Sequence, residues 1–107
     1  MKHKIGIVGG SGFVGFSLAK HLSKSFDIKI LDIRKPLYQF PNIEYTFCDI
    51  RNYDSVKVSL EDVDLVIHTA IVQIPLINEM KRLGYEVNVI GTQNVCEAVE
   101  KSPRIRG

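Results

Sequence analysis

Glycines near the amino terminus have the spacing of a phosphate-binding turn. The apolar run at residues 5–8 is followed by Gly9-Gly10-Ser11-Gly12-Phe13-Val14-Gly15, with a glycine at every third position. Gly9 can adopt the positive φ that an abrupt strand end requires. Gly12 has no side chain to keep a phosphate from backbone N–H groups, and Gly15 lets a following helix lie close to the strand. Because the first turn of such a helix offers free N–H donors, the segment predicts a pyrophosphate site.

Asp32 extends this pattern to a dinucleotide site. It stands 23 positions after Gly9 and directly follows the apolar run Ile28–Leu31. An acidic residue at about this distance accepts hydrogen bonds from the adenosine ribose, and its charge repels a 2′-phosphate. We therefore expect NAD rather than NADP, with Arg34 as the opposing signal because its cation could compensate a phosphate.

A nucleoside-triphosphate loop is the competing interpretation. Residues 10–17 fit the pattern G-x-x-x-x-G-K-[ST] at every position except the lysine, where Phe16 stands. That lysine makes the main contact to the terminal phosphates. Its absence favours the dinucleotide.

Asp49 and Ile50 follow a third apolar run, Ile43–Phe47. We expect the carboxylate of Asp49 to lie near the exocyclic amine of adenine and Ile50 to lie against the ring. The alternative is that Asp49 starts a helix.

His68, Thr69 and Ala70 follow a fourth apolar run, Val63–Ile67. Thr69 and Ala70 have small side chains, which suit the place where the nicotinamide end of the cofactor must pass. We interpret His68 as a packed or backbone-bonded histidine rather than a catalyst.

Asn88, Gly91 and Thr92 lie at i, i+3 and i+4, and hence on one side of a helix. Gly91 predicts close packing of this helix on the sheet, because a helix-interior glycine otherwise costs about 1 kcal/mol relative to alanine. Asn88 either holds backbone near the site or lies at the helix margin in water.

Apolar periodicity predicts the elements that position these residues. We expect four parallel strands at residues 4–8, 28–31, 43–47 and 63–67, the first of them fully buried. The first helix should follow Gly12 with an inward stripe of Val14, Leu18, Leu22 and Phe26. Asn52 should cap a short helix with Tyr53, Val56 and Leu60 inward. A long helix at residues 80–100 should carry Val87, Gly91, Val95 and Ala98 inward, after an irregular segment at 71–79 in which Pro75 stays outside any helix.

Strands that alternate with helices predict an α/β fold with a Rossmann-type doubly wound parallel sheet. The strand order should be 3-2-1-4, and the chain should end before the later strands. The carboxyl ends of all four strands then meet at one crevice, where such folds bind ligands.

The composition excludes several classes of protein. The 107 residues carry a net charge of +2, with 45% apolar and 24% charged residues, so we expect a single partial domain at 1–107 that binds no nucleic acid. No apolar run approaches the length of a membrane span, and no metal-ligand spacing surrounds Cys48 or Cys96. We expect a cytoplasmic protein with reduced thiols, no metal and no membrane partner.

Five ordered motifs carry a resemblance that covers residues 4–101: G-G-S-G-F-V-G, L-D-I-R, C-D-I-R, V-D-L-V-I-H-T-A and V-N-V-I-G-T-Q-N-V. The set resembles the extended short-chain dehydrogenase/reductase family, which includes NAD-dependent epimerases and dehydratases, and is most similar to its 3-beta-hydroxysteroid dehydrogenase branch. The resemblance implies a site-organising role for Asn88 and cofactor roles for Gly9, Gly12, Phe13, Val14, Gly15, Asp32, Asp49, Ile50 and Ala70.

The departure from this family concerns catalysis. Family members are about three times as long, and their Tyr-x-x-x-Lys pair follows the segment that ends here. Tyr53 and Lys57 have that spacing, but they come after the third strand, on the order of 14 Å from the fourth. We therefore assign no catalytic residue. We expect the NAD-binding portion of a dehydrogenase, epimerase or dehydratase for a sugar nucleotide or hydroxysteroid-like alcohol, or alternatively a non-catalytic dinucleotide-binding sensor or partner subunit.

The fourth strand should be an edge of the sheet. It contains no lysine or proline to protect it, and Arg104–Gly107 is too short to cover it well. We expect copies of the chain to associate through this edge or through the last helix.

Overall fold

The computed structural model describes residues 3–72 and 76–107 and contains a four-stranded parallel sheet with the order β3-β2-β1-β4. The strands are β1 (Lys4–Val8), β2 (Asp27–Asp32), β3 (Ile43–Phe47) and β4 (Leu65–His68). Ile7 of β1 pairs with Ile30 of β2 on one side and with Ile67 of β4 on the other. The doubly wound Rossmann-type sheet predicted from the sequence is confirmed.

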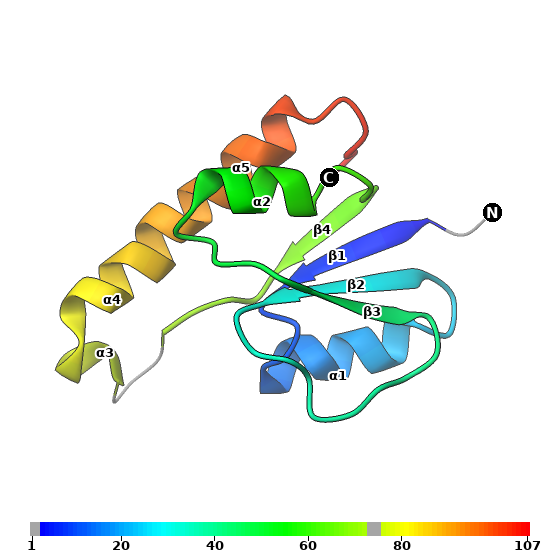
Figure 1. Ribbon diagram of the computed structural model, residues 1–107, viewed down its shortest axis with the longest axis horizontal. Coiled ribbons are helices and arrows are strands. Elements are labelled where there is room, and N and C mark those ends of the chain that lie inside the picture. The colour runs from blue at the N-terminus through cyan, green and yellow to red at the C-terminus, as the bar shows by residue number, and fades with distance from the viewer. Residues whose placement is uncertain (1–2, 73–75) are drawn as a thin grey trace.

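The two faces of the sheet bury separate apolar clusters, because side chains alternate along each strand. Ile5, Ile7, Ile28 and Ile30 pack with Ala19 of helix α1 (Phe13–Leu22). On the opposite face, Val8 and Leu31 pack with helices α2 (Tyr53–Ser59) and α5 (Thr92–Lys101). Figure 1 shows α1 on one side of the sheet and α2 and α5 on the other.

Helix α1 begins where the sequence predicts but turns its inward face one residue further along. Gly15 and Ala19 are the buried positions, whereas Val14 is 57% exposed. The prediction that Val14 faces inward is therefore wrong. The physical reason is the close approach of Gly15 to the turn after β1. This contact turns Val14 toward the open surface at the carboxyl ends of the strands.

The carboxyl-terminal helical region is less regular than predicted. The segment runs through α4 (Lys81–Tyr85), the π-helical segment η1 (Glu86–Gly91) and α5, and it extends beyond the carboxyl ends of the strands (Figure 1). The inward positions agree with the prediction: Gly91, Val95 and Ala98 are buried, and Val87 is partly buried. A short helix, α3 (Leu76–Glu79), occupies part of the segment predicted to be irregular, whereas Pro75 lies outside the described residues.

Strand β4 starts two residues later than predicted and includes His68. The carboxylate of Asp64 accepts the backbone N–H of Lys4 at 2.8 Å, so regular pairing of β1 with β4 begins at Leu65.

The prediction that Arg104–Gly107 is too short to cover the β4 edge is wrong for the first half of the strand. The backbone N–H of Arg106 donates to the carbonyl of Asp64 at 2.9 Å, and the N–H of Val66 donates to Gly107 at 2.9 Å. Arg104 also pairs with the Asp64 carboxylate at 3.0 Å. Side-chain and backbone contacts together hold this short segment, which length alone does not predict.

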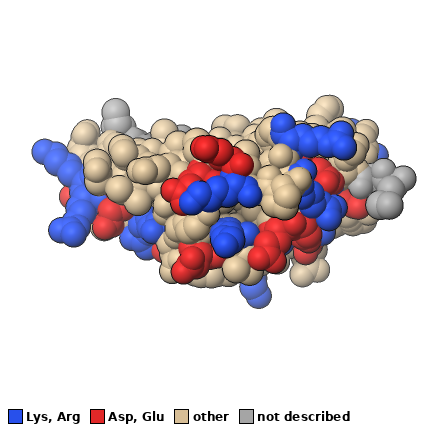
Figure 2. All heavy atoms as spheres, turned by 90° about the horizontal axis from the view of Figure 1, so that it is seen from above, with Lys and Arg blue, Asp and Glu red and all other residues tan. Residues whose placement is uncertain are grey.

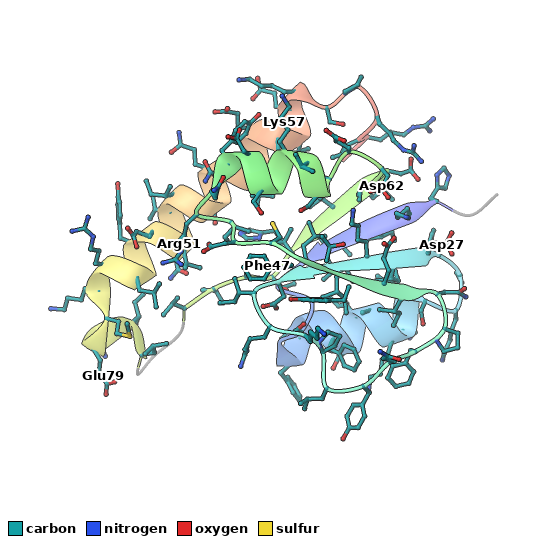
Figure 3. The ribbon with its side chains drawn as sticks, in the orientation of Figure 1. Asp27, Phe47, Arg51, Lys57, Asp62 and Glu79 are labelled. Carbon is teal, nitrogen blue, oxygen red and sulfur yellow. The ribbon has the colours of Figure 1, made fainter. Side chains whose placement is uncertain are left out.

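Charged side chains gather at the amino ends of the strands, away from the crevice. Asp62, labelled in Figure 3, accepts hydrogen bonds at 3.0 Å from both Lys4 and the buried Lys29. Burial opposes ionisation of Asp62, but these two hydrogen bonds outweigh it and lower the pKa of the carboxyl. Over the face that α2 and α5 form, cationic and anionic side chains are interspersed (Figure 2). No helix in the described part of the chain combines the length and apolar character needed to cross a bilayer.

Candidate functional site

A cleft of about 840 Å³ lies at the carboxyl ends of the four strands. It is bounded by the turns that follow each strand and by the long helical segment. The predicted site residues that line it are Gly9, Gly12, Phe13, Val14, Gly15, Asp32, Arg34, Asp49, Ile50, Thr69 and Ala70. The topology therefore collects residues from four separate motifs at one surface, as the strand order predicts.

The turn after β1 requires glycine for two separate reasons. Gly9 has φ of 80°, and a Cβ at this position would lie 2.6 Å from the backbone N of Ala70. A Cβ on Gly15 would collide with the carbonyl oxygen of Gly9. The hydroxyl of Thr69 donates to the carbonyl of Val8 at 2.8 Å, which fixes the segment after β4 against this turn.

The amino terminus of α1 opens into the cleft without a side-chain cap. Gly12 is the N-cap residue, and it has no side chain that could accept a hydrogen bond from the first turn. A Cβ on Gly12 would contact only the carbonyl oxygen of Gly9, at 3.4 Å. A larger residue would therefore fit at this position as far as the protein's own atoms are concerned. Without a side-chain cap, the N–H groups of the first turn can bind an external acceptor.

Asp32 organises the glycine-rich turn. Its Oδ2 accepts the N–H of Ser11 at 3.1 Å, and its Oδ1 accepts the N–H of Arg34 at 3.1 Å. The Ser11 hydroxyl donates to the carbonyl of Arg34 at 2.6 Å, which joins the turns after β1 and β2. Asp32 therefore lines the cleft beside the uncapped helix, and its role in binding a ribose stays a prediction.

Asp49 lies across the cleft and does not start a helix. Its carboxylate accepts hydrogen bonds from Nε and Nη2 of Arg51, at 3.0 and 2.7 Å to the nearer oxygen. This pairing lowers the pKa of Asp49 and keeps the carboxylate charged. Asn52 instead caps α2, because its side chain accepts the N–H of Ser55 at 3.2 Å. Ile50 is 6% exposed and leaves only a small surface toward the cleft.

Asn88 faces inward and hydrogen-bonds to backbone near the site, and it does not lie at the helix margin in water. Its Oδ1 accepts the N–H of Val72 at 2.8 Å, and its Nδ2 donates to the carbonyl of Val72 at 3.1 Å. Asn88 lines a neighbouring hollow of about 390 Å³ with Thr69, Ala70 and Val14 rather than the main cleft. It therefore positions the segment after β4.

His68 lines the same hollow and is a packed residue. Its Nε2 lies 2.9 Å from the hydroxyl of Thr92, so its hydrogen-bond partner is a side chain and not the backbone. Its Nδ1 is buried without a hydrogen-bond partner among the described residues. Burial lowers the pKa of His68, so the ring is neutral near pH 7.

Comparison with known proteins identifies the family. The sequence profile of the 3-beta hydroxysteroid dehydrogenase/isomerase family matches residues 6–104. The chain belongs to this family. Sterol-4-alpha-carboxylate 3-dehydrogenase, decarboxylating, from Bos taurus is 30% identical over 97 residues, which are 90% of this chain and 26% of the bovine protein. The chain spans about a quarter of the length of the curated relatives that it matches.

Solved structures agree with membership of the 3-beta hydroxysteroid dehydrogenase/isomerase family. An epimerase from Methanothermobacter thermautotrophicus has a TM-score of 0.85 and 25% identity, covering 97% of this chain and 33% of the epimerase. A short-chain dehydrogenase from Leptospira borgpetersenii, solved with bound NAD+, has a TM-score of 0.77 and 25% identity over 92% of this chain and 44% of that one. The resemblance to the extended short-chain dehydrogenase/reductase family, and to its hydroxysteroid branch, is confirmed.

In this family member Tyr53 begins α2 and lines neither the cleft nor the neighbouring hollow. Its ring packs against the apolar cluster between the sheet and α5, with Nζ of Lys101 5.9 Å from the ring centroid. These contacts agree with the interpretation of Tyr53 as a helix residue. Within residues 3–72 and 76–107, no group of His, Cys, Asp or Glu side chains has an arrangement that could hold a metal ion.

Four residues that shape the cleft were not predicted from the sequence: Gly10, Ser11, Arg51 and Asn94. Arg51 lines the cleft, Ser11 joins two turns, and Asn94 donates to the carbonyl of Ile50 at 2.8 Å. A Cβ on Gly10 would lie 2.8 Å from the Ile30 side chain, so this glycine is needed for packing on β2. Arg51 had a local signal, because an aspartate often accepts the N–H of the residue two positions on.

Proposed function

We propose that residues 1–107 are the NAD(H)-binding part of an NAD-dependent dehydrogenase, epimerase or dehydratase. The observation that carries the proposal is the meeting, in one cleft, of the uncapped amino terminus of α1 with the Asp32 carboxylate. In this proposal the first turn of α1 binds the pyrophosphate, Asp32 the adenosine ribose, and Asp49 with Ile50 the adenine. Phe13 and Val14 flank the pyrophosphate, and the nicotinamide end lies toward Thr69 and Ala70.

The residues present fit such a cofactor. A volume of about 840 Å³ lies within the range of small-molecule sites, and Gly12 leaves the helix N–H groups accessible. Bound NAD(H) would supply hydride transfer at its nicotinamide ring. The chain's own contribution is to hold the cofactor and, through Asn88 on Val72, to fix the wall beside its nicotinamide end.

NADH is expected to bind more tightly than NADPH, by about tenfold or more. The charge of Asp32 would face the 2′-phosphate of NADPH, and a buried or half-buried like-charge contact costs more than 1 kcal/mol. Titration of the chain with each cofactor, followed by calorimetry or nicotinamide fluorescence, gives the two dissociation constants. A preference for NADPH would mean that the guanidinium of Arg34 dominates the ribose pocket.

The activity of the whole protein is a further part of this proposal. The names of its sterol and hydroxysteroid dehydrogenase relatives support a hydroxysteroid-like alcohol as the substrate, and the resemblance to the epimerase family supports a sugar nucleotide. The proposed chemistry requires a catalytic residue that we do not assign within residues 1–107. A non-catalytic dinucleotide-binding sensor or partner subunit is the alternative function. Both cysteines are free thiols, which supports the proposed cytoplasmic location.

We also propose self-association through the last helical segment rather than through the β4 edge. Met80, Tyr85 and Val89 are exposed apolar side chains on or next to α4 and η1. Light scattering over a concentration series should show a mass above that of one chain. Substitution of Tyr85 and Val89 by glutamate should restore the monomer, whereas the control Lys81→Glu should not. A strictly monomeric chain at high concentration would contradict this proposal.

A further inference from the structure

The tripeptide Asp-Ile-Arg occurs twice at the crevice, as Asp32-Ile33-Arg34 at the carboxyl end of β2 and as Asp49-Ile50-Arg51 between β3 and α2. In each copy the aspartate Oδ1 accepts the N–H of the arginine two residues on, at 3.1 and 3.0 Å. The two copies therefore share one local backbone turn. Their side chains differ.

The arginine side chain folds back on its aspartate only in the second copy. Arg51 makes a forked contact to Asp49, with Nη2 2.7 Å from Oδ2 and Nε 3.0 Å from Oδ1. In the first copy Ser11 already occupies Oδ2 of Asp32, and Arg34 has no ion pair among residues 3–72 and 76–107. Asp32 thus binds the backbone of the glycine-rich turn, whereas Asp49 binds the side chain of its own arginine.

The second copy is also attached to the long helical segment. Arg51 Nη1 lies 3.6 Å from Oε1 of Glu86, and Figure 3 shows Arg51 between the start of α2 and that segment. Asn94 holds the carbonyl of Ile50, and Ile50 packs so closely on Gly91 that a Cβ there would lie 2.5 Å from its Cδ1. By contrast, Ile33 in the first copy is 57% exposed.

Arg51 leaves Asp49 with a defined remaining capacity to accept hydrogen bonds. Three N–H groups of Arg51 contact the carboxylate: N donates to Oδ1 at 3.0 Å, Nη2 donates to Oδ2 at 2.7 Å, and the single Nε–H is shared between Oδ1 at 3.0 Å and Oδ2 at 3.2 Å. Since a carboxylate has about four acceptor positions in all, these three donors leave about one position, on the Oδ2 side where the shared Nε contact is longer, in a fixed orientation. A single amino N–H of a purine satisfies that position, whereas the carbonyl of a 6-oxopurine would face the carboxylate with like partial charge.

We propose that Arg51 is a positioning residue that sets the base selectivity of the cleft by holding Asp49 toward a purine 6-amino group. The inference rests on the proposed dinucleotide function and deepens it. Arg51 touches neither the pyrophosphate-binding helix terminus nor Asp32. Its effect is therefore confined to the base end of the ligand, and base discrimination is the quantity that reports it.

The test compares NAD+ with nicotinamide hypoxanthine dinucleotide, in which a carbonyl replaces the 6-amino group. Calorimetry gives the ratio of their dissociation constants for the unsubstituted chain and for Arg51→Gln. We expect NAD+ to bind about tenfold more tightly to the unsubstituted chain, the effect of one hydrogen bond to a charged group. In Arg51→Gln the ratio should fall to about twofold, because the carboxylate loses its fixed orientation.

Three further variants make the test specific. Arg34→Gln changes the matching residue of the first copy, and Arg82→Gln removes a 92%-exposed arginine whose Nε lies 3.7 Å from the same Glu86. Arg34 lines the ribose end of the cleft, so its substitution can change the affinity for both dinucleotides alike. The ratio of the two dissociation constants should stay tenfold in both control variants. Arg51→Lys retains the charge without the fork and should resemble Arg51→Gln, which keeps the test valid if Arg51→Gln folds poorly. An unchanged or larger ratio in the Arg51 variants overturns this inference alone, whereas failure of the unsubstituted chain to bind NAD+ overturns the proposed function and this inference with it.

Discussion

Gly9→Ala is expected to lower the free energy of unfolding by about 3 kcal/mol or more and the thermal midpoint by about 10 °C or more. Gly9 has φ of 80°, a conformation that costs an L-residue about 1–2 kcal/mol. The added Cβ would also lie 2.6 Å from N and 2.7 Å from Cα of Ala70, which are backbone atoms of the segment that follows β4. Neither can move without breaking the contact between β1 and the segment after β4.

Gly12→Ala is the matched control for this prediction. Gly12 has φ of −77° and ψ of 175°, which alanine adopts freely, and its Cβ would make one ordinary contact at 3.4 Å. Thermal unfolding followed by circular dichroism should therefore separate the two variants by about 10 °C. Equal midpoints would show that the turn after β1 relaxes around a side chain and that Gly9 is not a structural requirement.

The sheet could be predicted because its sequence signals are local. Three strands are short, mainly apolar runs, and Ile43–Phe47 alternates apolar and polar residues. The strands lead into residues with a polar or conformational role, such as Gly9, Asp32 and Asp49. Parallel pairing then places these residues at the same edge without any knowledge of side-chain contacts. The cleft contains them together for this reason.

Contacts between distant segments could not be predicted in the same way. Arg104–Gly107 lies along β4 because Asp64 binds Arg104 by its side chain and Arg106 by its carbonyl, and neither partner is indicated by the segment's own four residues. Arg51 likewise looks like Arg34 in sequence. Their different roles depend on where the glycine-rich turn and Glu86 lie in space.

The π-helical segment left no distinct signal in the sequence. The inward residues Val87, Gly91, Val95 and Ala98 have the i, i+4, i+8, i+11 spacing of an ordinary α-helix. The segment η1 nevertheless lies next to the cleft. Its Asn88 binds the backbone of Val72 and its Gly91 packs against Ile50, and Val72 and Ile50 both line the cleft.

Gly12→Ala is further expected to weaken NADH binding by about a hundredfold while the fold stays intact, a loss of about 2.7 kcal/mol. The Cβ would enter the cleft beside the N–H groups of the first turn of α1, where the proposed pyrophosphate must make its hydrogen bonds. Loss of two or more such charge-assisted hydrogen bonds accounts for the magnitude. Fluorescence titration of NADH against the unsubstituted chain and Gly12→Ala measures it, with thermal unfolding of both as the stability control.

The two glycine variants separate an effect on folding from an effect on binding, because a Cβ at Gly9 would collide with the protein and a Cβ at Gly12 would not. Gly9 is surrounded by backbone atoms, so its substitution reports on the fold, whereas Gly12 faces open space that only a ligand would fill. A further comparison with NMN, which has one phosphate and no pyrophosphate, should show a smaller loss for Gly12→Ala than NADH shows. If Gly12→Ala binds NADH as tightly as the unsubstituted chain, the phosphates do not pass the α1 terminus, and the proposed orientation of the cofactor is wrong even if the cleft binds it.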